Sequence, residues 1–373
     1  MSTLRNVAIV GFAQLPVVAR DEHHVALDMI YTVVRQALAN CGVEPAAIEY
    51  QISGSTDYTD GRPFGFAAAL DAMGCWPPKQ DLHLEMDAAF CVYYAWLRMQ
   101  AGDCETALVV GHGKTSEGDP NRVGNLQLDP YYQAPMGLDL KSTAALQASA
   151  YMARTGAADR DLAVIAARNR AAGARNPDNQ LRQPATAEDL MRTPWEVEPL
   201  RAGYMPPLGE SATCMILATD SKASQLCDRP VWIQGIHQIA EFQTLGGRDL
   251  SRSISTQLAA RHACAMAGLE GASEVDLIEL FATTPVEELI LCEALGLHPM
   301  AARPAINPSG GPLCAHPIMN TGLIRMGEVF RQLSGRADGR AVPEARRGMA
   351  HATQGHCLQH NLVCVLGTER RWT

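Results

Sequence analysis

The two halves of this sequence repeat one order of secondary-structure signals at nearly constant spacing. An apolar strand segment, a helix closed by glycine and a second strand occur at Val7–Val10, Val25–Cys41 with Gly42 and Ile48–Ile52, and again at Val231–Ile233, Ser253–Ala267 with Gly268 and Val275–Phe281. Val231 follows Val7 by 224 residues. Gly268 follows Gly42 by 226 residues. Any α/β chain can echo itself by chance, but a constant offset over several elements favours a duplicated domain.

The remaining strand and helix signals extend this alternation. They are a helix over Ala89–Ala101, a strand over Thr106–Val110, a helix over Asn320–Leu333 and a strand over Leu362–Leu366. Alternation of this kind predicts an α/β fold with a largely parallel sheet whose faces are covered. Residues from about 113 to 200 have no counterpart of equal length in the second half, and a long insertion of this kind is typical of a cap over a binding site. We therefore divide the chain into residues 1–229, which include the cap, and residues 230–373.

Composition narrows the class of protein. Of 373 residues, 47% are hydrophobic and 19% are charged, which suits a large globular core. The net charge of −9 argues against nucleic acid as a partner. The eleven cysteines form no CxxC pair, no signal-peptide core follows Met1, and no apolar run reaches the ~18 residues of a membrane helix. We expect a cytoplasmic enzyme that contacts no membrane and, since its acidic residues lack ligand spacing, holds no metal.

The stretch from Asn307 to Gly322 is the most informative segment. Asn307-Pro308 initiates a turn, and Gly310-Gly311 permits backbone conformations that are closed to other residues. His316 follows and is fixed by Pro317 just before the predicted helix. An imidazole placed there could donate to a developing oxyanion on a thioester carbonyl, an effect worth roughly 3 kcal/mol per donor. The alternative is a structural histidine bonded to a backbone carbonyl.

This stretch resembles the asparagine-proline-glycine-glycine, histidine-proline and threonine-glycine signature of the thiolase superfamily, and most closely that of the sterol-carrier-protein or lipid-transfer type. The segments Ala101–Gly111, Pro199–Ala218 and His351–Gly367 fit the same family. The resemblance implies the five-layer thiolase fold, with two similar βαβαβαββ halves around central helices and an inserted cap. It also implies a homodimer and a CoA thioester as substrate, without a permanently bound cofactor. Relatives without the usual cysteine often work with a small partner protein that contains a zinc ribbon and an OB fold.

The catalytic cysteine of the family is the main departure. Counting back from Ala101-Gly102 without gaps places its position at Glu85. The nearest cysteine, Cys91, lies six residues later. A thiolate at a helix N-terminus is activated by the helix dipole, whereas a thiol one or two turns into the helix is a core residue. Both interpretations of Cys91, as a nucleophile and as a core residue, remain open.

Other family positions also differ. Phe281-Ala282-Thr283-Thr284 stands where relatives carry a histidine-aspartate or asparagine-glutamate element that helps to form an oxyanion hole. Phe281 cannot donate a hydrogen bond, so Thr283 is a candidate for part of that role, with strand packing as the alternative. In the C-terminal turn His351 is the best positional match to a catalytic residue of the family, and His356 and Cys357 are lesser candidates.

A thiolase-like protein without its cysteine must use other chemistry or none, and one branch of the family cleaves β-hydroxyacyl-CoA by a retro-aldol reaction. That reaction needs a base and donors that stabilise a thioester enolate, but no acyl-enzyme. His316 could stabilise the enolate, and His351, Glu85 or Asp87 could carry the proton. Glu85 and Asp87 would face one side of an extended segment, with a helix cap or charge pairing as the alternative.

Three functions follow from these candidates. The first is an aldolase-type lyase, the second is an acyltransferase that uses Cys91 or another cysteine, and the third is a non-catalytic subunit of a thiolase-like complex. The candidate catalytic residues are His316, His351, Glu85, Asp87 and Cys91. The candidate oxyanion and loop residues are Asn307, Gly310, Gly311 and Thr283.

Overall fold

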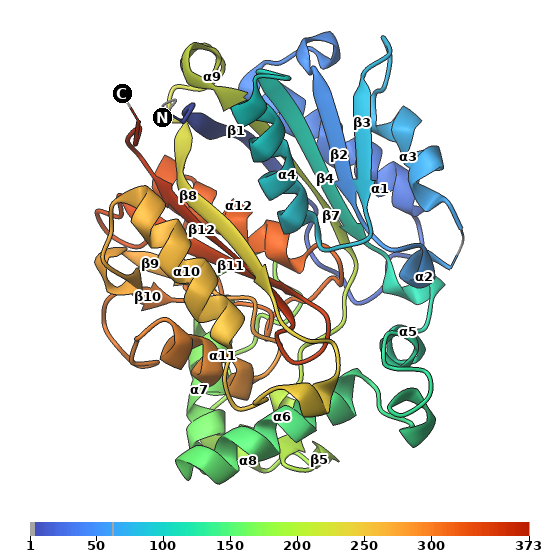
Figure 1. The fold of residues 1–373 in the computed structure, drawn as a ribbon, viewed down its shortest axis with the longest axis vertical. Helices are drawn as coiled ribbons and strands as arrows, with labels where there is room; N and C mark the ends of the chain where they lie inside the picture. Colours follow the sequence, from blue (N-terminus) through green and yellow to red (C-terminus); the bar gives the residue numbers. More distant parts are fainter. Residues whose placement is uncertain (1–3, 62, 373) are drawn as a thin grey trace.

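A computed structural model describes residues 4–61 and 63–372. Within these residues one sheet of ten strands runs through the molecule (Figure 1). The strands are β1 (Val7–Gln14), β2 (Tyr50–Gly54), β3 (Gln80–Leu84), β4 (Thr106–Gly113), β7 (Ser211–Thr219), β8 (Val231–Ala240), β9 (Leu277–Glu279), β10 (Ala305–Ile306), β11 (Arg347–Gln354) and β12 (His360–Gly367). Their order in the sheet is β10-β9-β11-β12-β8-β1-β7-β4-β2-β3.

The two halves of the sheet share one topology. In each half the first strand pairs antiparallel with the last, the last pairs antiparallel with the penultimate, and two parallel strands follow. The first half uses β1, β7, β4, β2 and β3, and the second uses β8, β12, β11, β9 and β10. The halves join where Ala8 pairs with Trp232 and Ile9 with Val231. The repeat in the sequence is therefore a repeat in the fold.

Helices complete five layers, as expected for the thiolase fold. The helices are α1 (Ala26–Cys41), α2 (Asp57–Asp60), α3 (Gly65–Met73), α4 (Ala88–Ala101), α5 (Pro120–Leu126), α6 (Leu140–Thr155), α7 (Asp159–Gly173), α8 (Ala187–Met191), α9 (Asp220–Leu226), α10 (Ile254–Ala267), α11 (Pro285–Ala294) and α12 (Thr321–Ser334). Helices α4 and α12 pack on each other between the two half-sheets, α1 and α3 cover the first half, and α10 and α11 cover the second (Figure 1). Three buried apolar clusters separate these layers.

The two central helices begin and end where the sequence signals predict, to within one residue. Helix α4 starts after Asp87, whose carboxylate accepts from Ala89 N, and ends at Gly102 in the left-handed conformation with φ of 81°. Helix α12 ends in the same way at Gly335, with φ of 77°. Glycine adopts this conformation without strain, so it fixes the helix end. Because both helices are placed so firmly, the loops at their N-termini are also well positioned.

The inserted segment is anchored on the second half of the molecule. Helices α6 and α7 pack against α11, and their buried residues share one apolar cluster with α10 and the second half-sheet. A short hairpin of β5 (Trp195–Val197) and β6 (Leu200–Arg201) belongs to this segment. Helix α5 contacts α2 and α6. The segment is therefore a fixed wall at one end of the sheet, at the bottom of Figure 1.

The ten-stranded sheet is mixed rather than largely parallel, since five of its strand pairings are antiparallel and four are parallel. Strands β1, β4, β8 and β12 extend beyond the predicted segments, and two other predicted strands are shortened or shifted. The strand predicted over Val275–Phe281 is only Leu277–Glu279, because Leu280 N donates to the side chain of Asn307 and the chain then turns towards α11. The strand predicted over Ile48–Ile52 is shifted to Tyr50–Gly54, because a helical turn at Pro45–Ala47 comes first.

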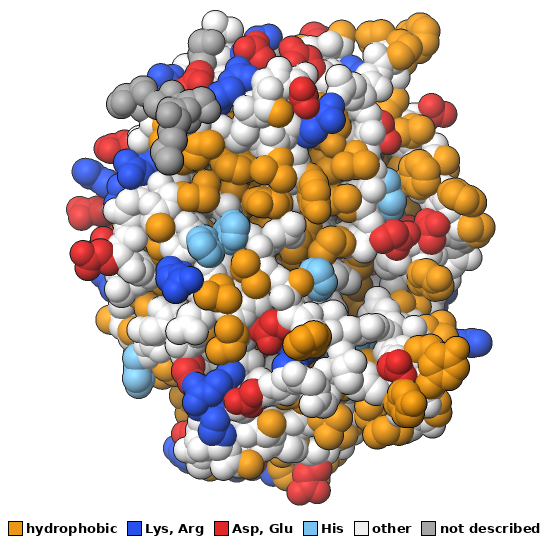
Figure 2. All heavy atoms as spheres, in the orientation of Figure 1, with side chains coloured by type: hydrophobic (Ala, Val, Ile, Leu, Met, Phe, Trp, Pro, Cys, Tyr) orange, Lys and Arg blue, Asp and Glu red, His pale blue; other side chains and the backbone are white. Residues whose placement is uncertain are grey.

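Strand β3 is the outer edge of the first half-sheet. Leu82 on β3 and Leu97 on α4 are each 39% exposed, and hydrophobic side chains gather over this part of the surface (Figure 2). An edge strand of this kind presents unpaired backbone groups that another chain can use. Among the helices of the described residues, none has the length and apolarity needed to cross a membrane.

Candidate active site

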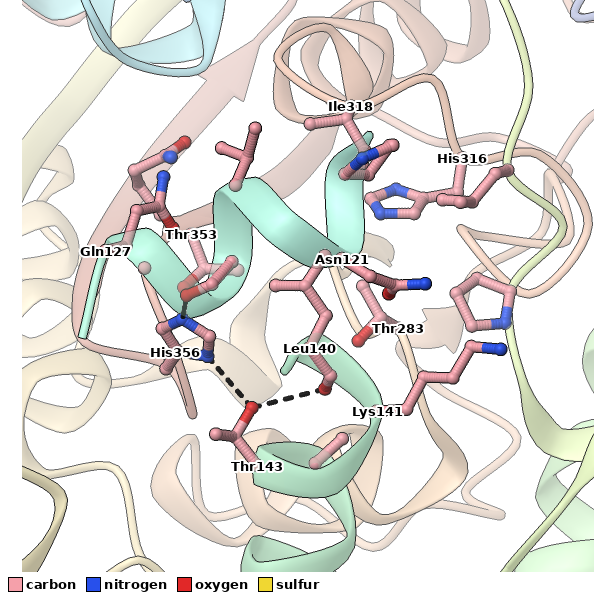
Figure 3. A pocket seen from close by; sticks show the side chains of 18 of the residues that line it. Asn121, Gln127, Leu140, Lys141, Thr143, Thr283, His316, Ile318, Thr353 and His356 are labelled. Atoms are coloured by element: carbon pink, nitrogen blue, oxygen red, sulfur yellow. Dashed lines mark hydrogen bonds between the residues drawn. The ribbon is translucent and has the colours of Figure 1, made fainter. Parts of the chain in front are cut away.

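A pocket of about 190 Å³ lies where the cap meets both halves of the molecule. Its walls come from α5, α6, the loop before β7, the turn between β9 and α11, the loop before α12, and the end of β11. Most of the lining is apolar, with Leu140, Phe281 and Ile318 among its residues. Asn121, Thr283 and His316 surround the same space (Figure 3). A mainly apolar pocket with a few convergent polar groups is the usual form of a small-molecule site.

The glycine-rich loop supports this pocket from outside it. Asn307 accepts from Leu280 N through Oδ1 (2.6 Å) and donates from Nδ2 to Glu288 Oε2 (3.0 Å). Gly310 has φ of 96°, and a Cβ there would lie 2.4 Å from Cα of Gly173. Asn307, Gly310 and Gly311 are all absent from the pocket lining. Their conformations serve close packing of the loop on α7, and their role as oxyanion and loop residues stays a prediction.

A buried ion pair lies beneath the same loop. Arg325 Nη1 donates to Glu279 Oε2 and to Ser309 Oγ, each at 2.6 Å. Both charged side chains are fully buried. Buried charges persist only when they are paired, so this contact joins β9, the glycine-rich loop and α12.

His316 is a sequence candidate that lines the pocket. It is 8% exposed, and its Nδ1 lies 2.9 Å from Thr321 Oγ1, which in turn contacts the Pro317 carbonyl at 2.9 Å. Burial, with a further contribution from Arg325, lowers the pKa of His316 to about 4, so the ring is neutral near pH 7. The Thr321 hydroxyl has one proton. When it donates to Nδ1, Nε2 carries the ring proton; when it donates to Pro317, Nε2 presents a lone pair.

Thr283 also lines the pocket, and it leads to a residue that sequence reasoning missed. Its backbone N and Oγ1 donate to Glu287 Oε2 at 2.6 and 2.7 Å. Glu287 lines the pocket and is 7% exposed. Burial raises the pKa of its carboxyl above the ordinary value. Nothing in the sequence distinguishes Glu287, because an acidic residue in the first turn of a helix is a common capping feature.

Cys91 lies in the core between the central helices and the sheets. It is the fourth residue of α4, is fully buried and is absent from the pocket lining. Burial raises the pKa of its thiol well above the ordinary value, with a further contribution from Asp87. The structure therefore favours the core interpretation of Cys91 over the nucleophile.

Glu85 and Asp87 do not form the predicted pair on one side of a strand. Both lie after β3 ends, and the Glu85 side chain is 50% exposed and accepts from Asp57 N. Asp87 is 1% exposed and is the N-cap of α4. Neither residue lines the pocket, and Asp87 caps α4; their shared role in proton transfer stays a prediction.

His351 is enclosed in the second half-sheet. It pairs with Val363 across β11 and β12, is fully buried, and its Nε2 donates to Asn361 Oδ1 at 2.9 Å. Burial lowers its pKa to about 4. It does not line the pocket, whose nearest lining residue on β11 is Thr353, two residues later, and its role as proton carrier stays a prediction.

His356 and Cys357 do reach the pocket. Nε2 of His356 donates to the Gly124 carbonyl at 2.8 Å, and its Nδ1 lies 2.8 Å from Thr143 Oγ1 (Figure 3). Both ring nitrogens are therefore occupied in tying α5 and α6 to this loop. Burial raises the pKa of the Cys357 thiol to about 12, so little thiolate forms near pH 7.

Comparison with known sequences finds one matching family profile and several similar proteins. The sequence profile of the thiolase C-terminal domain-like family matches residues 240–368. An acetyl-CoA acetyltransferase of Methanothermobacter thermautotrophicus is 28% identical over 64% of this chain and 66% of its own length. The benzoylsuccinyl-CoA thiolase subunit BbsB of Thauera aromatica is 24% identical, over 58% and 60%. Sterol carrier protein 2 of Gallus gallus is 28% identical, over 54% and 40%. These matches span less than two thirds of each relative.

Solved structures share the fold. The Ltp2-ChsH2(DUF35) aldolase superposes with a TM-score of 0.82 at 19% identity, over 97% of this chain and 98% of that one. A monomeric SCP2-thiolase like protein type 1 from Mycobacterium smegmatis gives 0.79 at 17% identity, over 99% and 78%. The duplicated half-sheets, the central helices and the His316 pocket thus define a thiolase-fold protein. By the family match of its residues 240–368, by its relatives and by its fold, the chain is similar to thiolases and to sterol carrier protein 2.

Proposed function

We propose that this protein cleaves or forms a carbon–carbon bond of an acyl-CoA thioester by aldol chemistry, without a cysteine acyl-enzyme. The observation that carries the proposal is the placement of the thiols. Cys91 is sealed in the core, and the thiol that lines the pocket, Cys357, has its pKa raised to about 12. Covalent acyl transfer needs an activated thiolate, whereas retro-aldol cleavage needs only a proton carrier and an oxyanion donor.

The cleavage step balances without a cofactor. A base removes the proton of the β-hydroxyl, the Cα–Cβ bond breaks, and its electron pair forms the thioester enolate while Cβ becomes a carbonyl carbon. Neutral His316 donates from Nε2 to the enolate oxygen when Thr321 donates to Nδ1. A neutral imidazole suits this role because its N–H stabilises the enolate oxygen by a hydrogen bond and is too weak an acid to give up the proton. Protonation of Cα then releases the shortened acyl-CoA.

The relatives support a CoA thioester as the substrate. Two of them are named as proteins that act on acetyl-CoA or benzoylsuccinyl-CoA, and one structural neighbour is named as an aldolase. The apolar lining around Leu140, Phe281 and Ile318 fits an apolar acyl group. The proposal uses the thioester as substrate and requires no permanently bound cofactor.

Acyl transfer through Cys357 is the second candidate, because this thiol lines the pocket. Intact-protein mass spectrometry after incubation with acetyl-CoA and with aromatic acyl-CoA esters separates the two. We expect wild type to bind the acyl-CoA esters in calorimetry and to form no acyl adduct. Cys357→Ala should keep full cleavage activity, and His316→Ala should lose it. An adduct mapped to Cys357 would establish the acyltransferase instead. Absence of both binding and adduct would support a non-catalytic subunit.

We also propose a homodimer formed at the edge strand β3. The exposed apolar side chains Leu82 and Leu97 beside unpaired backbone groups suit pairing with a second copy. A small zinc-ribbon and OB-fold partner remains a proposal as well, supported by the aldolase neighbour, whose name pairs Ltp2 with ChsH2(DUF35). Sedimentation equilibrium of wild type and Leu82→Lys tests the dimer, which the added charge should dissociate.

A further inference from the structure

We propose that Glu287 is the catalytic residue that carries the proton between the β-hydroxyl oxygen and Cα of the substrate, an inference that rests on the proposed aldol chemistry. No residue predicted for this task reaches the pocket. Glu85 is on the surface, Asp87 caps a helix and His351 is enclosed in the sheet. The reaction needs such a group, and Glu287 is the carboxyl that the fold places in the pocket wall.

The hydrogen bonds of Glu287 leave one of its oxygens available. Oε2 accepts from the backbone N and from Oγ1 of Thr283, at 2.6 and 2.7 Å. Oε1 has no hydrogen-bond partner among the described residues. Thr284, the N-cap of α11, fixes the backbone of Glu287 by accepting from its N at 3.2 Å. The carboxyl is therefore held by one oxygen, and the other can exchange a proton with a ligand.

Glu287 differs from the other buried glutamates in its lack of a cationic partner. Among the described residues, four further glutamates are buried, and each is paired with a cation in the contacts Glu210–Lys114, Glu279–Arg325, Glu288–Arg168 and Glu328–Arg340. Glu287 has no ion pair within those residues; its partners are a hydroxyl and an amide of Thr283. A buried carboxyl without a cation is costly, and such groups concentrate at functional sites.

The surroundings of Glu287 allow both protonation states. Burial favours the neutral acid, while the hydrogen bonds from Thr283 and the N-terminus of α11 favour the carboxylate. A carboxyl balanced in this way can take the hydroxyl proton as a base and return it to Cα as an acid. One proton moves from oxygen to carbon, and the carboxyl ends in its starting state. No oxidant or further reactant is needed.

Hydrogen–deuterium exchange at Cα tests the proton transfer directly. Acetyl-CoA and propionyl-CoA are incubated in D2O with wild type, Glu287→Gln and Glu287→Asp, and deuterium in the acyl group is followed by mass spectrometry. Loss of a general acid–base typically costs about 10² to 10⁴ in rate, so we expect Glu287→Gln to lose at least ~100-fold in exchange. Glu287→Asp should keep a measurable part of the rate, and calorimetric binding of both esters to Glu287→Gln should be unchanged.

Glu293→Gln on the same helix is the matched control. Glu293 is partly exposed and pairs with Arg154 and Arg252 outside the pocket, so its variant should exchange like wild type. Exchange by Glu287→Gln at the wild-type rate would overturn the role of Glu287. If Glu287→Gln fails to fold, as judged by circular dichroism, Glu287→Asp decides, because exchange in that variant at the full wild-type rate argues against proton transfer through this carboxyl.

The same experiment separates this inference from the proposed function. Wild type that exchanges Cα but forms an adduct on Cys357 and cleaves no β-hydroxyacyl-CoA would end the aldolase proposal and leave the proton carrier intact. Cleavage that persists equally in Glu287→Gln would end the role of Glu287 as the proton carrier and leave the aldolase proposal intact. Wild type that exchanges neither ester faster than an enzyme-free sample would overturn both.

Discussion

The carboxylate of Asp87 bridges the N-termini of the two central helices. Its Oδ1 accepts from Ala89 N in α4, and its Oδ2 accepts from Gly322 N in α12, both at 2.9 Å. The two helices occupy equivalent places in the duplicated halves, so one side chain of the first half caps a helix in each. Gly322 permits this approach, because a Cβ there would lie 2.4 Å from the same carboxylate.

This bridge predicts a specific pH dependence of stability. Burial raises the pKa of Asp87 to about 6, so the folded state binds its proton more tightly than the unfolded chain. The contribution of Asp87 to the free energy of unfolding therefore falls as pH rises from about 4 to 6, by about 3 kcal/mol. Asp87→Asn lacks this titration. In urea unfolding, the free energy of unfolding of Asp87→Asn should rise relative to that of wild type as pH increases across this range. A difference between the two that does not change with pH would contradict the raised pKa of Asp87.

Replacement of Cys91 tests whether its thiol takes part in catalysis or only packs in the core. Because its thiol is sealed among the residues between the two half-sheets, Cys91→Ala should keep its activity within about 2-fold and lose about 1 kcal/mol of stability from the small cavity. Steady-state kinetics and thermal unfolding measure the two effects. A variant that stays folded and loses all activity would restore Cys91 as the nucleophile.

The sequence predicts the fold well where a local signal fixes an element. Gly102 and Gly335 end the central helices in the left-handed conformation, and those ends are placed to within one residue. The near-constant offset of the halves likewise corresponds to one strand order used twice. These features depend on backbone conformation and hydrophobic periodicity, which a single sequence contains.

The site is predicted less well, because it depends on distance along an element and on side-chain direction. His316 reaches the pocket since the following Pro317 and α12 fix its place. His351 lies in the right strand, but two residues short of the pocket at Thr353. Glu287 was missed because the first turn of a helix often carries an acid, and only the tertiary structure shows which one lacks a cation.

His351 leads to a prediction with the opposite pH sign. Its pKa is lowered to about 4, so the unfolded chain binds the proton more tightly and stability is lost as pH falls from about 6.5 to 4. The expected contribution is about 3 kcal/mol. His351→Gln keeps a donor for Asn361 and does not titrate, so it should resist acid better than wild type in urea unfolding. Its activity near pH 7 should change little, and a 100-fold loss would return His351 to the active site.

Gly310 tests whether close packing of the glycine-rich loop determines the pocket. Its φ of 96° and a virtual Cβ only 2.4 Å from Cα of Gly173 leave no room for a side chain. Gly310→Ala should therefore destabilise the protein by about 3 kcal/mol or more, since backbone must move on both sides of the contact. Gly246→Ala is the control, because nothing lies within 4 Å of a Cβ there. Thermal unfolding and binding of acetyl-CoA measure both variants. If Gly310→Ala is as stable as Gly246→Ala, the loop can rearrange at little cost, and the cap rather than the loop then determines the shape of the pocket.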